Sequence, residues 1–199
     1  MRRTSSGRSA VVLIGCITLM SSVASVHADN RLSNKGHWDR TGAAAHVKFL
    51  DHTDSPWPVD TASADWDEAN QIDVDWQLTD GSSQCRAGCV RVRTRAPDED
   101  LFFGPNCTGA AGYWTNGPPD ANNHWDPDNE VRFNRSCNGE RERVKRALAC
   151  QELGHALGLA HADTQQSCMW QKASEADTTP RSDTSIICLT RESTVACRK

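Results

Sequence analysis

The sequence has no apolar run long enough to cross a membrane, no excess of basic residues and no internal repeat. Its longest apolar stretch, Ala10 to Met20, is about half of the roughly twenty residues that a spanning helix needs. Lysine and arginine number 22 against 26 aspartates and glutamates, so the formal net charge is −4. Phosphate binding needs clustered basic side chains. The composition therefore predicts neither nucleic acid nor an anionic membrane as a partner.

The N-terminus has the pattern of a signal peptide covering residues 1–28. Arg2, Arg3 and Arg8 precede the apolar run, and Val26-His27-Ala28 is an acceptable cleavage site of small residues. Cys16 also fits a lipoprotein processing site, which we rank second because apolar residues continue past it. The pattern predicts a secreted protein that is not inserted in a membrane after signal cleavage.

The mature chain of 171 residues is long enough for one domain with a core and short for two. Its net charge is −7, from 19 basic and 26 acidic residues. We expect residues 29–42 to form a flexible polar lead-in and residues 43–199 to form a single domain. We expect the protein to be a monomer.

Eight of the nine cysteines follow the signal peptide, which predicts up to four disulfides in an exported chain. Cys85 and Cys89 have a spacing that also suits a zinc-binding pair. No second close pair follows them, so disulfides are the preferred interpretation.

Eleven residues that begin at Gln151 and end at His161 have the spacing of a metal site. Residues four apart on a helix lie on one face, so Gln151 and His155 are able to converge on one ion. Glu152, one residue further, is placed to reach a water without being a ligand, as a general base must. Gly158 is able to turn left-handed and end the helix, which brings His161 back toward the same ion.

The segment resembles the active-site helix of metzincin metallopeptidases, whose motif is H-E-x-x-H-x-x-G-x-x-H. The resemblance is greatest to secreted bacterial members near the matrixin and astacin groups. These families place a methionine turn after the third histidine, and Met169 stands at a suitable distance here. Residues 45–51 and 64–70 resemble, less specifically, the first strand and the following helix of that fold.

The resemblance implies a secreted endopeptidase that hydrolyses protein or peptide substrates. His155 and His161 would bind zinc, Gln151 would occupy the third ligand position, and Glu152 would activate water. Met169 would form a floor under the metal. A disulfide between Cys150 and Cys168, which lie beside the helix motif and the methionine, is a further hypothesis.

The chain departs from the family at Gln151, where the motif has histidine. An amide oxygen is a neutral and harder donor than imidazole, and it suits magnesium, calcium or manganese better than zinc. We therefore expect weaker zinc binding. Asp163 and His124 are candidate substitute ligands. The astacin tyrosine that follows the methionine is also missing, because Trp170 stands there and the only tyrosine of the chain is Tyr113.

Two other functions stay open on the sequence alone. A metzincin-like protein that has lost catalysis could act as a secreted binding or inhibitory module. In a disulfide-stabilised structural domain, His155 and His161 would merely pack, Met169 would fill the core, and Glu152 would be a solvated helix charge. Residues 98–100 and 126–130 carry oxygen donors for a structural calcium ion, although acidic turns explain them equally well.

Periodicity predicts an α+β fold with a mostly parallel sheet if the resemblance holds. Alternation of apolar and polar residues predicts strands at 45–51, 72–78, 89–95 and 131–133. A helix is expected from Asp60 to Asn70, and a long one from a cap at Asn138 to Gly158. Residues 104–128 are too rich in glycine, proline and asparagine for a long element. In a metzincin this stretch would lie near the edge strand that pairs with substrate.

Overall fold

The computed structural model describes residues 38, 40–41, 44–54, 57–68, 72–80, 85, 88–107, 110–115, 125 and 129–180. The predicted signal peptide and His124 lie outside these residues. Among the described residues three disulfides are formed, Cys85–Cys89, Cys107–Cys137 and Cys150–Cys168, and Cys188 and Cys197 lie outside these residues. Disulfides persist in oxidising surroundings, so these bridges are compatible with an extracellular protein. In the part of the chain just defined, no helix has the length and apolar character to cross a membrane.

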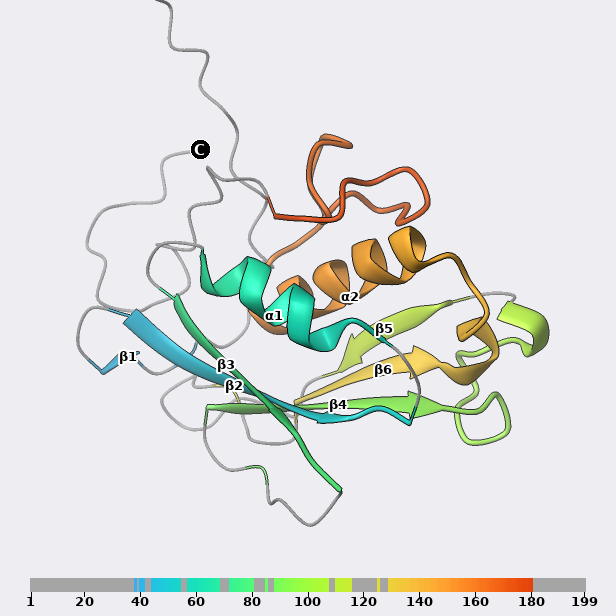
Figure 1. The fold of residues 1–199 in the computed structure, drawn as a ribbon, viewed down its shortest axis with the longest axis horizontal. Helices are drawn as coiled ribbons and strands as arrows, with labels where there is room; N and C mark the ends of the chain where they lie inside the picture. The colour runs from blue at the N-terminus through green and yellow to red at the C-terminus, as the bar shows by residue number, and fades with distance from the viewer. Residues whose placement is uncertain are drawn as a thin grey trace, which may run out of the picture.

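A mixed sheet forms one layer of the molecule (Figure 1). Its strands are β1 (Arg40–Thr41), β2 (Ala44–His52), β3 (Ile72–Leu78), β4 (Cys89–Arg95), β5 (Gly112–Thr115) and β6 (Glu130–Asn134). The order is β3-β2-β4-β6-β5, with β1 beside the start of β2. β2, β3, β4 and β6 run parallel, whereas β1 and β5 are antiparallel to their neighbours. The fold is therefore α+β.

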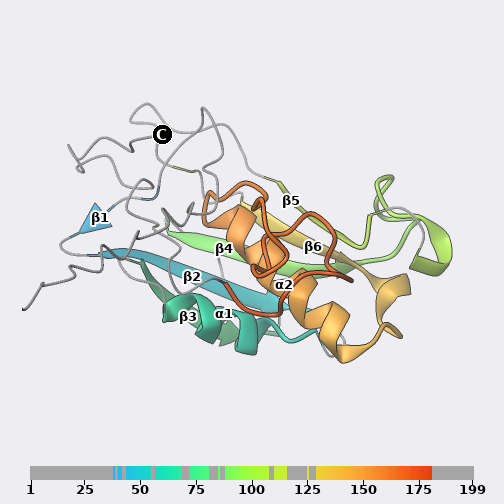
Figure 2. The same ribbon diagram turned by 90° about the horizontal axis from the view of Figure 1, so that it is seen from above.

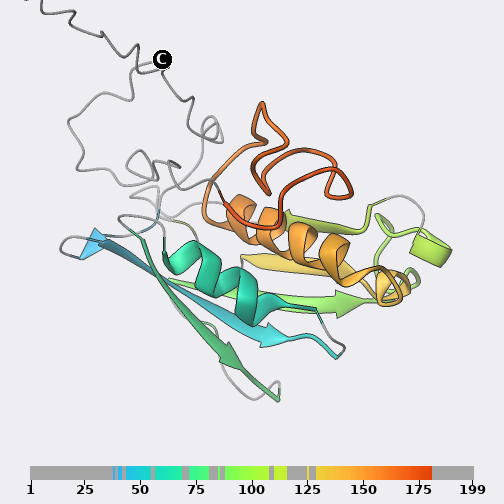
Figure 3. The ribbon, with the colours of Figure 1, turned by 45° about the horizontal axis from the view of Figure 1, so that its top comes forward.

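Two helices, α1 (Val59–Asp67) and α2 (Glu142–Ala156), lie on the same face of this sheet (Figure 3). Figure 2 shows α1 along the side of β2 and β3 and α2 along the side of β6 and β5. Short 3-10 turns, η1 (Pro105–Cys107) and η2 (Arg135–Cys137), precede β5 and α2. The two helices leave the opposite face of the sheet uncovered by any helix of the described residues.

The core lies between the sheet and the two helices because alternate strand residues point to opposite faces. Val47 and Phe49 of β2 are buried, whereas His46, beside Val47, is exposed and Lys48, between them, is half-buried. Trp66 of α1 is fully buried, and its indole N–H donates to the Cys150 carbonyl of α2 at 2.9 Å. The hydrogen bond ties α1 to the helix that carries the metal motif.

One sequence expectation needs correction. The long helix begins at Glu142, because Asn138 ends η2 and the Asn138 side-chain oxygen accepts a hydrogen bond from the Trp57 indole at 2.9 Å. Within the predicted lead-in, Trp38 is buried and its indole N–H donates to the Ala156 carbonyl at 3.1 Å. The stretch expected to lack a long element contains the four-residue strand β5.

Candidate metal and cleft site

The C-terminus of α2 ends in a glycine turn that positions both histidines. Gly158 has φ 99°, the left-handed conformation that glycine adopts at little cost. Its N–H donates to the His155 carbonyl at 2.9 Å, and the Leu159 N–H donates to the Gly154 carbonyl at 3.0 Å. These two bonds form a Schellman motif. The chain reverses here and carries His161 back beside His155.

The two imidazoles meet at their Nε2 atoms, which are 3.3 Å apart. Two nitrogens bound to one tetrahedral zinc ion lie about 3.3–3.4 Å apart when each is roughly 2.05 Å from the metal. The observed separation of His155 and His161 therefore matches one edge of a zinc tetrahedron. The rings are almost perpendicular, with an interplanar angle of 77°.

The second ring nitrogen of His155, Nδ1, has a backbone hydrogen-bond partner. It lies 2.7 Å from the Leu159 carbonyl oxygen, so the proton sits on Nδ1 and the Nε2 lone pair is left for a metal. Burial lowers the pKa of His155 to about 4; the hydrogen bond to Leu159 opposes this shift, and the nearby His161 adds to it. Burial also lowers the pKa of His161. Both rings are therefore neutral at pH 7, as ligands must be.

Glu152 lies between α2 and the edge strand β5. Only 5% of the residue is exposed, and burial raises the pKa of its carboxyl to about 8. A Cβ atom placed on Gly112 of β5 would lie 3.1 Å from Glu152 Cγ, so the glycine allows this close contact. Among the described residues, Glu152 has no hydrogen-bond or ion-pair partner to hold its carboxylate charge.

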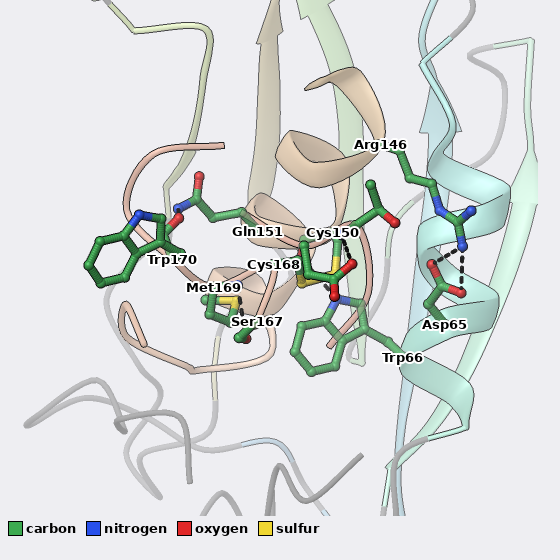
Figure 4. Close-up of a disulfide and its surroundings, with 11 residues drawn as sticks. Asp65, Trp66, Arg146, Cys150, Gln151, Ser167, Cys168, Met169 and Trp170 are labelled. Carbon is green, nitrogen blue, oxygen red and sulfur yellow. Dashed lines mark hydrogen bonds and ion pairs between the residues drawn. A yellow bond between two sulfur atoms is a disulfide. The ribbon is translucent and has the colours of Figure 1, made fainter. Parts of the chain in front are cut away.

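Gln151 is buried, and its amide nitrogen donates to the Trp170 carbonyl at 2.7 Å (Figure 4). This bond assigns the amide orientation, because a carbonyl accepts only from the nitrogen end. The amide oxygen alone is left as a metal donor. Gln151 also joins α2 to the segment that follows Met169.

Met169 lies directly beneath α2 and is fully buried. A Cβ atom on Gly154 would be 2.2 Å from the Met169 sulfur and 2.7 Å from Trp66, so only glycine admits both side chains. The loop of Met169 is fixed by the Cys150–Cys168 disulfide and by the Ala162 N–H, which donates to the Met169 carbonyl at 2.8 Å. The methionine therefore forms a packed floor below the helix end.

Of the two candidate substitute ligands, Asp163 does not join the histidine pair, and His124 lies outside the described residues. Asp163 is exposed, and no three His, Cys, Asp or Glu side chains in the described ranges gather closely enough to hold a metal ion. The calcium hypothesis gains no support either. Glu130 bonds to Arg132 at 2.6 Å, and Asp100 accepts from Arg132 at 3.2 Å. Asp126 and Asp128 lie outside the described residues.

A cleft of about 480 Å³ opens beside the candidate site. Glu152, Gln151 and His161 line one end of it. The remaining lining residues, most of them small or apolar, are Cys107, Ala110, Ala111, Gly112, Glu140, Val144, Leu148, Gln171, Ala173 and Ser174. The cleft thus runs along α2, with the start of β5 and the segment before it on one side and the segment after Met169 on the other.

Sequence reasoning missed the residues that hold this arrangement together. The Trp170 carbonyl and the Leu159 carbonyl are backbone atoms, which carry no side-chain signature. Gly154 and Gly112 were detectable as glycines inside regular elements, where a close approach of another group is the usual reason.

Comparison with profiles of known protein families finds no match, and comparison with curated protein sequences finds none. Among solved structures, the chain is similar to archaemetzincin from Archaeoglobus fulgidus, crystallised with malonate. The similarity covers 68% of this chain and 95% of that one, with 10% identity and a TM-score of 0.35. Likeness at this level carries no functional argument, so the site must be judged from its own geometry.

Proposed function

We propose that the chain is a secreted, zinc-dependent endopeptidase of metzincin type. The observation that carries the proposal is the convergence of His155 and His161, with Nε2 atoms 3.3 Å apart above the packed floor of Met169. Gln151 is the third ligand through its amide oxygen. The protein acts as a monomer outside the cell, and its partner is a protein or peptide substrate.

The roles follow from the chemistry of each group. Zinc held by these ligands supplies a Lewis acid that polarises the scissile carbonyl and acidifies water. Glu152 accepts the proton of the attacking water and gives it to the departing amine. Burial raises the pKa of the Glu152 carboxyl to about 8, and a positive charge beside it would favour the carboxylate that the base role needs.

The substrate lies in the cleft as an extended strand. Within the described residues β5 pairs only with β6, so the outer edge of β5 has backbone groups to offer a substrate chain. Such pairing would hold a peptide bond beside Glu152, which β5 contacts at Gly112.

Elemental analysis of purified, oxidised mature protein tests the metal site. We expect near-stoichiometric zinc in the wild type, tighter binding in Gln151→His, and none in His155→Ala. Zinc in Gln151→His alone would contradict the amide-containing site. Proteolysis of a denatured protein substrate, with chelator as control, then tests turnover.

A catalytically silent binding module is the second candidate. The favouring observation is that the Gln151 amide nitrogen already donates to the Trp170 carbonyl, and that among the described residues two histidines alone bring imidazole to the site. Wild-type protein that binds peptides in the cleft but cleaves none, while Gln151→His both binds zinc and cleaves, would establish this alternative.

A further inference from the structure

One carboxylate, Glu140, lies in the cleft far from the candidate metal site. It is exposed and precedes the first turn of α2. Across the described residues Glu140 forms no ion pair, and its backbone N–H donates to the Cys137 carbonyl at 3.0 Å. A carboxylate without a partner at the end of a cleft is able to bind an incoming cation.

Arg143, the first arginine of α2, is engaged elsewhere. The Arg143 guanidinium donates to the carbonyls of Ser174 at 3.2 Å and Ala176 at 2.6 Å. Of the residues that line the cleft, only Glu140 and Glu152 are acidic, and none is a lysine or arginine. No basic residue of the cleft lining therefore neutralises Glu140.

The walls between the two carboxylates are apolar and fixed. Val144 and Leu148 of α2 face Ala110, Ala111 and Ala173 across the cleft. The segment before β5 forms one wall of the cleft and is held by the Cys107–Cys137 disulfide. It is also held by the Asn134 N–H, which donates to the Ala111 carbonyl at 2.9 Å. The same Arg143 bonds hold the opposite wall. A bound chain therefore meets a preformed surface, which limits the ordering cost of binding.

The length of the cleft relates Glu140 to the reaction centre. Glu140 stands two residues before Glu142, where α2 begins, and the ten-residue step from Glu142 to Glu152 covers about 15 Å along the helix axis. An extended peptide advances roughly 3.3 Å per residue, so this distance spans about four or five residues. The long aliphatic stem of lysine or arginine suits the apolar walls while its charge reaches the carboxylate.

We propose that Glu140 gives the cleft a preference for peptides that carry a basic residue about four positions from the peptide bond beside Glu152. This inference rests on the proposed function, because it assumes that the substrate peptide binds in this cleft. It adds the substrate class, namely chains with an apolar stretch at the reaction centre and a lysine or arginine beyond it.

Binding is measured with labelled alanine- and leucine-rich peptides in which one lysine, or norleucine as its uncharged counterpart, is moved along the chain. Fluorescence anisotropy on Glu152→Gln protein avoids cleavage during the measurement. We expect the lysine peptide to bind about threefold to tenfold more tightly at the matching position, the range of a partly exposed ion pair. We expect lysine and norleucine peptides to bind Glu140→Gln equally. We expect Glu140→Lys to bind peptides with glutamate at that position more tightly.

Glu68→Gln is the matched control, because Glu68 is an exposed glutamate at the end of α1 and does not line the cleft. The ratio of lysine to norleucine peptide binding should be the same in Glu68→Gln as in the protein without this substitution. An unchanged ratio of lysine to norleucine binding in Glu140→Gln would overturn the inference, as would absence of binding by every peptide. Far-ultraviolet circular dichroism shows whether each variant is folded.

Cleavage by the wild type separates this inference from the proposed function. Charge-dependent binding without any cleavage would refute the peptidase and leave the role of Glu140 intact. Cleavage whose lysine preference is the same in wild type and Glu140→Gln would support the peptidase and refute the role of Glu140.

Discussion

At the scale of single residues, Gly154 allows two buried side chains to approach α2 closely. A Cβ atom there would be 2.2 Å from the Met169 sulfur and 2.7 Å from Trp66, both fully buried. Packed interiors have no room to absorb such an overlap without shifting neighbours. Glycine is costly inside a helix, and its presence here is explained by the floor that it admits.

Gly154→Ala should therefore destabilise the protein, although alanine is the better helix former. Overpacking costs about 1–3 kcal/mol, whereas the gain in helix propensity is about 1 kcal/mol, so we expect a net loss of up to about 2 kcal/mol in the free energy of unfolding. Urea unfolding measures it. Gly139→Ala is the control, because a Cβ at Gly139 would meet nothing within 4 Å. Equal stability of the two variants would refute the close packing.

Glu152 acts on protons and is not a metal ligand in the proposed mechanism. Glu152→Gln keeps the size of the side chain but removes the acid, so kcat/KM should fall about 10²- to 10⁴-fold while zinc content stays unchanged. Peptide hydrolysis and elemental analysis on the same preparation check both halves. Loss of zinc together with activity would mean that the carboxylate is a ligand instead.

At the scale of elements, strands and turns with a strong local pattern were predictable. The predicted strands at 72–78 and 89–95 match the bounds of β3 and β4. Alternate residues of β4 are buried, whereas β3 buries Ile72 and Val74 and leaves Trp76 and Leu78 exposed. Gly158 predicted the end of α2, because the left-handed backbone conformation that ends many helices favours glycine. The local signal at these places agrees with the packing, which is why it succeeded.

The features that the sequence pattern did not predict depend on partners distant in the chain. β5 is four residues long and forms because its backbone pairs with β6, which sequence periodicity does not register. Asn138 has the side chain of a helix cap, but its oxygen is taken by the Trp57 indole from 81 positions away. The bond between Gln151 and the Trp170 carbonyl was invisible for the same reason.

The loop between β4 and β5 is fastened to the sheet by Asp100. Its carboxylate accepts from the Tyr113 hydroxyl, from the Phe102 N–H at 3.1 Å and from Arg132 at 3.2 Å. Burial alone would raise the pKa of Asp100, but these three hydrogen bonds outweigh it and hold the pKa below its usual value. The charged carboxylate is therefore the form that stabilises the folded protein.

This shift predicts an acid-dependent loss of stability. A carboxyl whose pKa is lowered on folding contributes stability above its unfolded pKa of about 3.9, and the contribution is lost as pH falls through the lower folded pKa. The stability difference between wild type and Asp100→Asn should be largest at pH 6 and shrink toward pH 3, as measured by urea unfolding. Asp98→Asn, at an exposed neighbour, should show no such trend. A constant difference for Asp100→Asn would contradict the assignment.

At the scale of the whole molecule, the candidate site is held by contacts between the two layers and the loop after α2. The Cys150–Cys168 disulfide and the Ala162–Met169 hydrogen bond join that loop to the helix end, and Gly112 brings β5 against Glu152. His155 and His161 are therefore positioned by the fold before any ion arrives. A metal that binds such a site stabilises the folded state alone.

Metal removal should consequently lower the melting temperature. An ion present at 100 times its Kd adds about 2.7 kcal/mol of stability, and about 2–4 °C per kcal/mol is typical for a chain of this size. We expect chelator to lower the Tm of the wild type by roughly 5–10 °C and added zinc to restore it, as followed by calorimetry. His155→Ala should melt at the same temperature with or without zinc, since one imidazole cannot form the 3.3 Å pair. Gln151→His should show a larger shift than the wild type, because imidazole is the better zinc donor. Restoration by calcium as effective as by zinc would instead mean that oxygen ligands elsewhere dominate, and that the histidine pair is not the stabilising site.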